Sequence, residues 1–345
     1  MIKSINAWRG IFAIVIVLLH SEVPMMESGA KLGVSFFFIA SGFLTTLRHH
    51  DEDLTSPGTW WTFWLKRAQR IYPLHWIALA CYMALYVLVM HKSIQWPQLA
   101  AQAALVQCWV PDKHYFFAYN GVSWFLGALL FHYACFPLIN RYFSRWRLQW
   151  QCLLIVAVIA ALAWWLPQLS PIKRIYTYVC PAFRLGDFVF GAFIANVYRK
   201  LNSSSVTYGT AKATFIEAIF IIIVLEVIFI DQTTELFMPW NSHLIWWIPV
   251  AIIVFSSAML NGQEGFIGRL LCTRPIQLLG EWSLEIYLFQ HVAATIVNYF
   301  ISPIYGHFGL MAYDKYVYTQ VPLLIIMAWA IHKARKIKKS HSSLQ

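Results

Sequence analysis

Long apolar runs, separated by short clusters of basic residues, make up most of the chain. A helix that crosses the hydrocarbon core of a bilayer needs about 20 predominantly apolar residues. Because ten segments qualify, we expect an all-α, polytopic transmembrane bundle of about ten spanning helices. The shorter apolar stretch 96–110 is interpreted as a re-entrant or interfacial helix. The expected spans are 5–23, 33–48, 73–91, 122–140, 151–168, 176–198, 213–231, 244–260, 278–300 and 316–334.

The distribution of basic residues predicts the orientation of the chain. If the N-terminus is cytoplasmic, 19 of the 26 Lys and Arg residues lie on the cytoplasmic side and six lie on the other, with Arg184 inside a span. Cytoplasmic loops carry an excess of Lys and Arg, so we expect both termini in the cytoplasm and the chain in the plasma (inner) membrane. The expected organisation is a membrane domain over 1–335 and a short basic cytoplasmic tail over 336–345 that contacts anionic lipid headgroups.

Composition supports a surface that faces lipid. Hydrophobic residues make up 59% of the 345 residues and charged residues only 12%, about half the charged share of a soluble domain. The net charge of +11 does not indicate a nucleic-acid partner, because the basic residues occur in short clusters between apolar runs. The six cysteines form no CxxC pair, so we predict neither a disulfide framework nor a metal site.

Titratable residues inside apolar spans are costly unless they pair or face a cavity, so each is a candidate functional residue. Arg9 and His20 in the first span are eleven residues apart. That spacing places them within about 20° of one helix face and about 16 Å apart along the axis. Taken alone, Arg9 would be a topology-setting charge and His20 an ordinary interfacial histidine. Their shared face makes them a candidate pair of a fixed cation and a base.

Two further segments predict a site for an anionic ligand near the cytoplasmic surface. Ser41 and Gly42 in the second span allow close approach of a neighbouring helix or of a ligand. Arg67 and Arg70 are three residues apart and would share a helix face, which suits phosphate groups. Basic residues here also satisfy the positive-inside pattern. Pro73 suits the first turn of the third span.

The remaining titratable residues in the spans receive weaker interpretations. Arg184 and Asp187 are three residues apart and are expected to form a structural ion pair. His132 is interpreted as structural, and His291 is expected near mid-depth in the ninth span. The other candidates are Glu217, Glu226, Glu281 and Glu285.

Six segments carry these residues in a characteristic order. They are NAWRGIFAIVIVLLH (Asn6 to His20), GVSFFFIASGF (Gly33 to Phe43), KRAQRIYP (Lys66 to Pro73), VSWFLGALLFHYACFP (Val122 to Pro137), FRLGDFVFGAFIA (Phe183 to Ala195) and GEWSLEIYLFQH (Gly280 to His291). Together they cover nearly the whole chain and resemble the acyltransferase-3 family of integral membrane acyltransferases, of the O-acetyltransferase type.

The resemblance implies transfer of an acyl group, usually acetyl from acetyl-CoA, to a hydroxyl of a surface polysaccharide, lipopolysaccharide or glycolipid. Acetyl-CoA would be a co-substrate, and no permanently bound cofactor is expected. Besides acyl-CoA, the implied partners are the glycan or glycolipid acceptor, the lipid bilayer and other glycan-assembly proteins. The implied site residues are His20 and Arg9 for catalysis, Arg67, Arg70, Ser41 and Gly42 for the donor, and Trp124, Arg184, Tyr287 and His291 for the acceptor or for positioning.

Two departures from the family pattern concern the acceptor. Many members carry a Glu after the Trp of the fourth span, where this chain reads SWFLGALLFHY. The sequence also lacks the fused extracytoplasmic esterase-like domain of some members. The membrane domain is therefore expected to deliver the acyl group itself, or to pass it to a separate protein.

The mechanism expected from these residues uses His20 as the base on the acceptor hydroxyl, since histidine titrates near neutral pH. Direct transfer is favoured over an acyl-enzyme, because no Ser or Cys nucleophile stands beside His20 in the sequence. A secondary transporter or flippase of glycan precursors is the alternative, because intramembrane His, Arg and Glu also serve proton relays. A non-catalytic sensor or scaffold is a further alternative.

Overall fold

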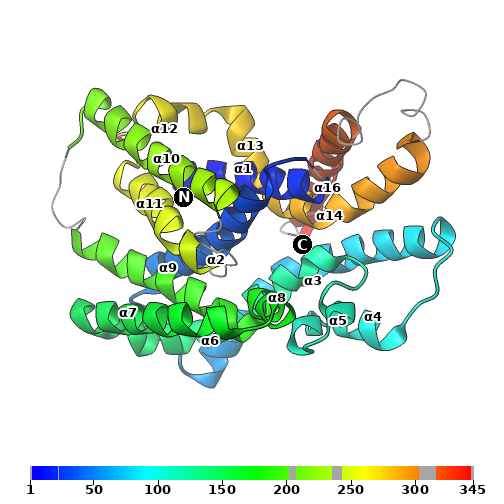
Figure 1. Cartoon of the computed structure of the whole chain (residues 1–345), viewed down its shortest axis with the longest axis horizontal. Coiled ribbons are helices and arrows are strands. Elements are labelled where there is room, and N and C mark those ends of the chain that lie inside the picture. Colours follow the sequence, from blue (N-terminus) through cyan, green and yellow to red (C-terminus); the bar gives the residue numbers. More distant parts are fainter. Residues whose placement is uncertain (1, 22, 202–206, 235–242, 303–315, 343–345) are drawn as a thin grey trace.

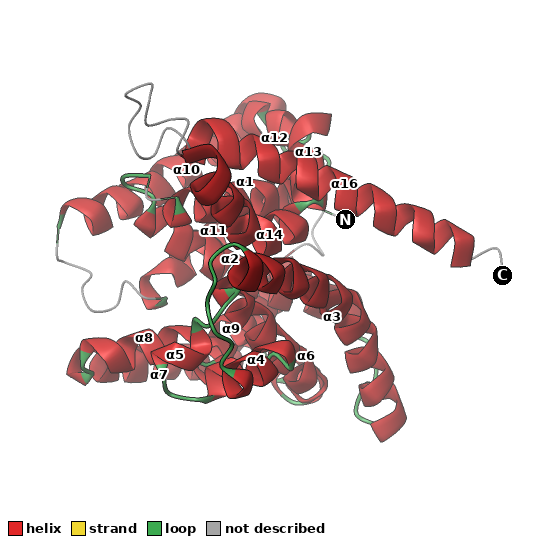
Figure 2. Ribbon diagram, turned by 90° about the vertical axis from the view of Figure 1, so that its right-hand side faces the viewer, coloured by secondary structure: helices red, strands yellow, loops and turns green. Residues whose placement is uncertain are grey.

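The computed structural model describes residues 2–21, 23–201, 207–234, 243–302 and 316–342, with side chains to 337. Over these ranges every regular element is helical and no strand is present, which confirms the all-α fold class (Figure 2). Eight helical stretches are long and apolar enough to span a membrane. They are α1 (Lys3–His20), α2 (Glu27–His49), α3 (Pro57–Leu88), η2 with α6 (Gly121–Ser123 and Trp124–Arg141, followed by η3, Phe143–Arg145), α7 with η4 (Leu148–Trp165 and Leu166–Gln168), α10 (Thr210–Thr233), α14 with the π-helical η7 (Ser283–Ile296 and Val297–Ile301), and the π-helical η9 with α16 (Tyr316–Gln320 and Val321–Ser342).

The other two expected spans differ from the simple pattern. The span expected at 176–198 is a bent pair, α8 (Pro171–Val179) and α9 (Pro181–Leu201), with 54° between the two axes. The span expected at 244–260 is η6 (Leu244–Trp246) with α11 (Trp247–Met259), which is apolar but shorter than the others. The described residues therefore hold eight spanning helices, or nine with the bent pair, and the side on which the termini lie stays a prediction.

Short helices connect the spans. The stretch 96–110 contains α4 (Trp96–Ala103) and η1 (Gln107–Trp109), and α4 packs against α3 and α5 (Lys113–Phe116). Two further short helices, α12 (Phe266–Leu271) and α13 (Arg274–Glu281), precede α14. Helix α16 continues without a break past residue 335, where the basic tail was expected to begin.

The third span begins earlier than expected. Ser56 caps α3 by accepting a hydrogen bond from the Thr59 amide at 3.3 Å, and Pro57 occupies the first turn. Pro73 lies inside the helix, so its predicted place in the first turn was wrong. The charged residues of KRAQR lowered the hydropathy of the first half of this helix and hid its start. Proline is tolerated inside membrane helices because neighbouring groups satisfy the freed carbonyl.

Helices α1 and α2 cross the centre of the bundle, with α12 and α13 above and α6 and α7 below (Figure 1). One apolar cluster, around Phe38 and Phe125, joins α2 to α6 and α14. A second cluster, around Phe43, Phe188 and Trp247, joins α2 to α9 and α11. Helix α1 contributes to both clusters, so it is held on several sides and positions the residues that it carries.

Glycines allow two of these helix pairs to approach closely. A Cβ at Gly42 would lie 2.9 Å from the backbone carbonyl carbon of Phe188, and Gly191 meets the backbone of Ile39 in the same way. In the second pair, a Cβ at Gly10 would lie 2.6 Å from the amide nitrogen of Gly280. Small residues that bring backbones together are a general device of membrane helix packing.

Candidate functional site

His20 and His291, far apart in the sequence, lie together where the end of α1 meets the middle of α14. Their ring centroids are 5.6 Å apart and their planes are nearly perpendicular, at 86°. His20 is exposed and His291 is half-buried. Because Gly10 lies against Gly280 near the start of α1 and His20 lies against His291 at its end, the two chain segments run in the same direction. His291 lies near the middle of the span Ser283–Ile301, where it was expected, and the end of α1 brings His20 beside it.

A relay of hydrogen bonds ties the helix ends at this site. The Ser21 hydroxyl donates to the side-chain oxygen of Gln320 at 3.0 Å, and the Gln320 amide donates to the carbonyl of Gln290 at 3.2 Å. The Gln290 side chain in turn donates to the carbonyl of Tyr287 at 2.8 Å. The end of α1, the middle of α14 and the start of the last span are thus held in one arrangement around the histidine pair.

Three tyrosines extend from the histidine pair. The Tyr82 ring lies 6.3 Å from His291 and 6.2 Å from Tyr86, which lies 5.2 Å from Tyr119. Tyr119 has a left-handed backbone with φ of 45°, which is uncommon for a residue with a side chain. Its hydroxyl accepts from the amide of Gln95 at 2.8 Å and donates to the carbonyl of the same residue at 3.0 Å. Burial raises the pKa of Tyr119, so its phenol stays protonated at neutral pH.

Arg9 lies in a different environment, nearer the start of α1. It is half-buried and within electrostatic range of Arg70 on α3 and of Glu285 on α14. Glu285 is only 2% exposed and accepts from Arg335 at 2.6 Å, with His332 at 3.5 Å. Four helices therefore converge on a basic cluster around one buried carboxylate. Arg9 lies within electrostatic range of Glu285, and His20 lies beside His291, both on α14, which is consistent with the predicted shared face.

The two arginines of the KRAQRIYP segment have different surroundings. The Arg67 guanidinium lies 2.8 Å from the Nε2 of His49 and stacks 3.9 Å from the centre of the Phe63 ring. Arg70 is exposed and lies toward Arg9. Of the two arginines expected to bind the donor, Arg70 is the more exposed, and the role of both in donor binding stays a prediction.

Ser41 and Gly42, expected along the donor path, make packing contacts. The Ser41 hydroxyl donates to the carbonyl of Phe37, one turn earlier, at 2.6 Å. Gly42 lies against the backbone of Phe188 on α9. The contact of Gly42 is the close approach of helices, the first of the two roles that the sequence allowed, whereas the Ser41 bond stays within α2. A role of either residue in donor binding stays a prediction.

Arg184 and Asp187 form the predicted ion pair, with 2.7 Å between Nε and Oδ2 and no solvent exposure at either side chain. Arg184 also donates to the Ser35 hydroxyl at 3.1 Å, and its guanidinium stacks on the rings of Phe38 and Tyr178. The Trp247 indole donates to the second oxygen of Asp187. Charge pairing, ring stacking and these two hydrogen bonds offset part of the cost of burying the pair, although the Arg184 Nη1 has no hydrogen-bond partner among the described residues.

Trp124, Tyr287 and His132 also lie in the interior. Trp124 packs against Tyr178 with 5.2 Å between ring centroids, and the Tyr287 hydroxyl donates to the carbonyl of Val122 at 2.8 Å. The His132 ring lies 3.0 Å from the carbonyl of Pro181, which agrees with a structural role. Trp124 and Arg184 thus have partners in the interior of the bundle, whereas His291 lies directly beside His20.

Sequence reasoning missed two groups of residues at these sites. Glu285 was already a candidate, but its partner Arg335 was missed, although a carboxylate in an apolar span needs a cation nearby. Tyr82 and Tyr119 gave no signal, because a tyrosine in an apolar helix or loop is common at membrane interfaces. Over the described ranges, no cluster of three or more His, Cys, Asp or Glu side chains could hold a metal ion.

The fold and these two polar sites define a multi-pass membrane protein with a histidine pair at one end of its first helix and a basic cluster nearer the other. The acyltransferase domain of the acyltransferase-3 family matches residues 2–331. The chain therefore belongs to the acyltransferase-3 family, as the six sequence segments predicted.

Two relatives extend this comparison. The chain is 24% identical over 280 residues to the acyltransferase MdmB of Streptomyces mycarofaciens, over 75% of this chain and 66% of that protein. It is 22% identical over 326 residues to the peptidoglycan O-acetyltransferase OatA of Listeria monocytogenes serovar 1/2a, over 86% of this chain and 50% of that protein. The chain thus spans less than two thirds of the length of either relative. No solved structure matches it.

Proposed function

We propose that this chain is a membrane-embedded O-acyltransferase of the plasma membrane. It moves an acetyl or similar short acyl group from cytoplasmic acyl-CoA to a hydroxyl of a cell-surface glycan or glycolipid precursor. The observation that carries the proposal is the pairing of His20 with His291 on the helix that also brings Arg9 to the basic cluster. Family membership supports acyl transfer, and the name of the Listeria relative supports a glycan acceptor.

The basic cluster is the proposed donor site. Arg9, Arg70 and Arg335 supply more positive charge than Glu285 neutralises. Guanidinium groups bind phosphates by charge-assisted hydrogen bonds, which suits the nucleotide end of CoA. The distance along α1 from Arg9 to His20 is about 16 Å at 1.5 Å per residue. The extended pantetheine arm of CoA would cover this distance and present the thioester to the histidines.

The histidine pair is the proposed reaction site. His20 accepts the proton of the acceptor hydroxyl as the oxygen attacks the thioester carbonyl, so that a C–O bond forms and the C–S bond breaks. The protonated imidazole then returns the proton to the departing CoA thiolate. His291, packed edge-on against His20, orients its ring. Tyr82 and Tyr86 offer an apolar ring face and a hydroxyl to the acceptor beside the histidines.

Single-turnover transfer from acetyl-CoA, measured with the full chain in nanodiscs, tests the reaction site. A general base contributes about 10²–10⁴ in rate, so His20→Ala should lose that factor while donor affinity stays unchanged. His291→Ala should have a smaller effect, through the orientation of His20. His114→Ala is the matched control, because His114 is exposed on α5 and its side chain lies outside the pair. Near-normal transfer by His20→Ala would refute its role as the base.

Glycan mass spectrometry on cells with and without the protein tests the acceptor. A mass difference of one acyl group would identify both the group and the glycan that carries it. Thioester turnover by the purified protein separates an acyltransferase from a transporter of glycan precursors, which moves its substrate without consuming acyl-CoA. A purified protein that binds acyl-CoA weakly and never cleaves it would contradict the proposal.

A further inference from the structure

A polar cavity lies where α2 ends and α7 begins, and none of the residues placed in the acyl-transfer site lines it. Its volume is about 750 Å³, within the range of pockets that hold small molecules. The walls come from His50, directly after α2, the segment between α6 and α7, the first turns of α7 and the end of α9. None of the described residues that line it is Asp or Glu.

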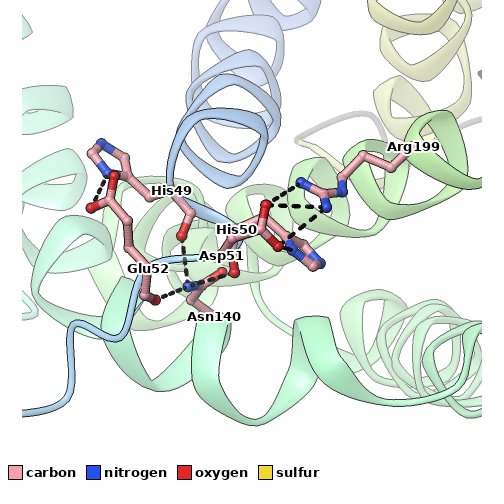
Figure 3. Close-up of polar contacts among 6 residues, drawn as sticks. All are labelled: His49, His50, Asp51, Glu52, Asn140 and Arg199. Atoms are coloured by element: carbon pink, nitrogen blue, oxygen red, sulfur yellow. Dashed lines mark hydrogen bonds and ion pairs between the residues drawn. The ribbon is translucent and has the colours of Figure 1, made fainter.

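The lining of this cavity is basic. Arg147, Arg199 and Lys200 carry three positive charges, and His50 adds a titratable ring. Just outside the lining, Asp51 pairs with Arg199 at 3.4 Å and with the His50 ring at 2.8 Å (Figure 3). The hydrogen bond from His50, and then the Arg199 charge, lower the pKa of Asp51, so this carboxylate is ionised at neutral pH. It offsets one cation and leaves the cavity with a net positive charge.

Hydrogen-bond donors also face the cavity without a partner. Helix α7 is 18 residues long, and no side chain caps its start, although Arg147, Leu148 and Gln149 line the cavity there. The amides at a helix start bind anions. Ser144 lines the same cavity and is only 5% exposed, yet its hydroxyl has no hydrogen-bond partner among the described residues. A buried hydroxyl without a partner is costly, and a ligand in the cavity would satisfy it.

One wall of the cavity continues into the surface that faces lipid. Only 17% of the apolar stretch of the span Leu148–Gln168, which contains α7, is buried inside the protein. The rest of this stretch is available to acyl chains. Trp146 and Trp150, which flank the cavity at the start of α7, are 48% and 54% exposed. Exposed Trp residues of this kind lie at the boundary between lipid and water. A ligand here can therefore place a charged head in the cavity and an apolar body along α7.

From this geometry we propose that the cavity binds the phosphate of an anionic phospholipid headgroup, with the acyl chains of that lipid along α7. The phosphate lies at the start of α7, where Arg147 and the Ser144 hydroxyl contact it. Basic pockets between membrane helices on the cytoplasmic side are suited to such headgroups.

The test uses the purified full chain in neutral detergent, with lipid binding measured by native mass spectrometry. Dioleoylphosphatidylglycerol should bind at least about tenfold more tightly than dioleoylphosphatidylcholine, which has the same chains and no net charge. Arg147→Gln should weaken binding of the anionic lipid by about tenfold, the loss of one charge-assisted hydrogen bond. Arg145→Gln is the matched control, because Arg145 is exposed in the same segment but does not line the cavity. It should change the affinity less than twofold.

Two results would overturn the proposal. If Arg147→Gln and Arg145→Gln lose equal affinity for the anionic lipid, the basic surface as a whole attracts the lipid and the cavity does not bind it. Adenosine 3′,5′-bisphosphate distinguishes a soluble phosphate from a headgroup, and at millimolar concentration it should leave lipid binding unchanged. The site takes a soluble phosphate if the bisphosphate binds in a manner that depends on Arg147 and the protein binds phosphatidylglycerol no more tightly than phosphatidylcholine. Ser144→Ala provides a second variant, with an expected loss of about threefold to tenfold.

Discussion

Replacing Gly42 by alanine tests whether this residue packs helices or lines the path of the donor. The added Cβ would lie 2.9 Å from the carbonyl carbon of Phe188, whereas ordinary contact begins at 3.4 Å. The carbonyl oxygen of Phe188 is nearer still, so helices α2 and α9 would have to separate by more than about 0.5 Å, because the clashing atoms are backbone and cannot rotate away. Overpacking of this kind costs about 1–3 kcal/mol, and the better helix propensity of alanine returns about 1 kcal/mol. We expect a net loss of up to about 2 kcal/mol.

The matched control is Gly58→Ala on α3. Gly58 is exposed, and nothing lies within 4 Å of its added Cβ, so this change should stabilise the helix by up to about 1 kcal/mol. The two variants should therefore differ by up to about 3 kcal/mol in the free energy of unfolding, measured in mixed detergent micelles. Gly191→Ala clashes across the same helix pair. The double variant with Gly42→Ala should therefore lose less free energy of unfolding than the sum of the two single variants. Normal stability of Gly42→Ala with a raised KM for acyl-CoA would refute the packing role and favour the donor path.

Three further predictions concern the charged residues and the orientation. Arg70→Ala should weaken acetyl-CoA binding by about 1.5–3 kcal/mol and leave acetyl-pantetheine, which lacks the nucleotide, unaffected; equal weakening of both would make Arg70 structural. Arg335→Gln should lower the free energy of unfolding by about 2 kcal/mol, because it leaves the buried carboxylate of Glu285 without its nearest cation. Glu285→Gln should cost less, because Arg335 can then reach water, and equal losses of stability in the two variants would contradict this reasoning. In a cysteine-free background in intact cells, Gly209→Cys should be shielded from an impermeant thiol reagent and Thr233→Cys should react. The opposite labelling would reverse the orientation.

The fold was largely predictable because the length and polarity of each apolar run decide whether a helix can span lipid. The first half of α3 was missed, since Lys66, Arg67 and Arg70 depress its hydropathy even though the helix is continuous. The bend between α8 and α9 follows Cys180 and Pro181, and a proline after an apolar run shows that a break is allowed without giving its angle.

The candidate site was predictable only in part. Helical periodicity gave the shared face of Arg9 and His20, because it depends on residues within one helix. It could not show that His291 lies beside His20, since that contact depends on how two distant helices pack. The same limit hid the bond between Arg335 and Glu285. For Gly42 the sequence offered two roles, and the position of Phe188, which shows the helix contact, follows only from the packing of α2 on α9.

The contacts of α1 with the last third of the chain have a consequence for biosynthesis. Asn6 donates to the backbone and the side chain of Gln277, 271 residues later, and His20 is separated from His291 by the same interval. A ribosome adds roughly 5–20 residues per second, so about 14–54 s pass between the emergence of the two partners. During that time α1 resides in the bilayer with Arg9 and Asn6 lacking their final neighbours. The nascent chain must therefore tolerate an incomplete polar face until α14 inserts, and α1, although made first, completes its packing late in assembly.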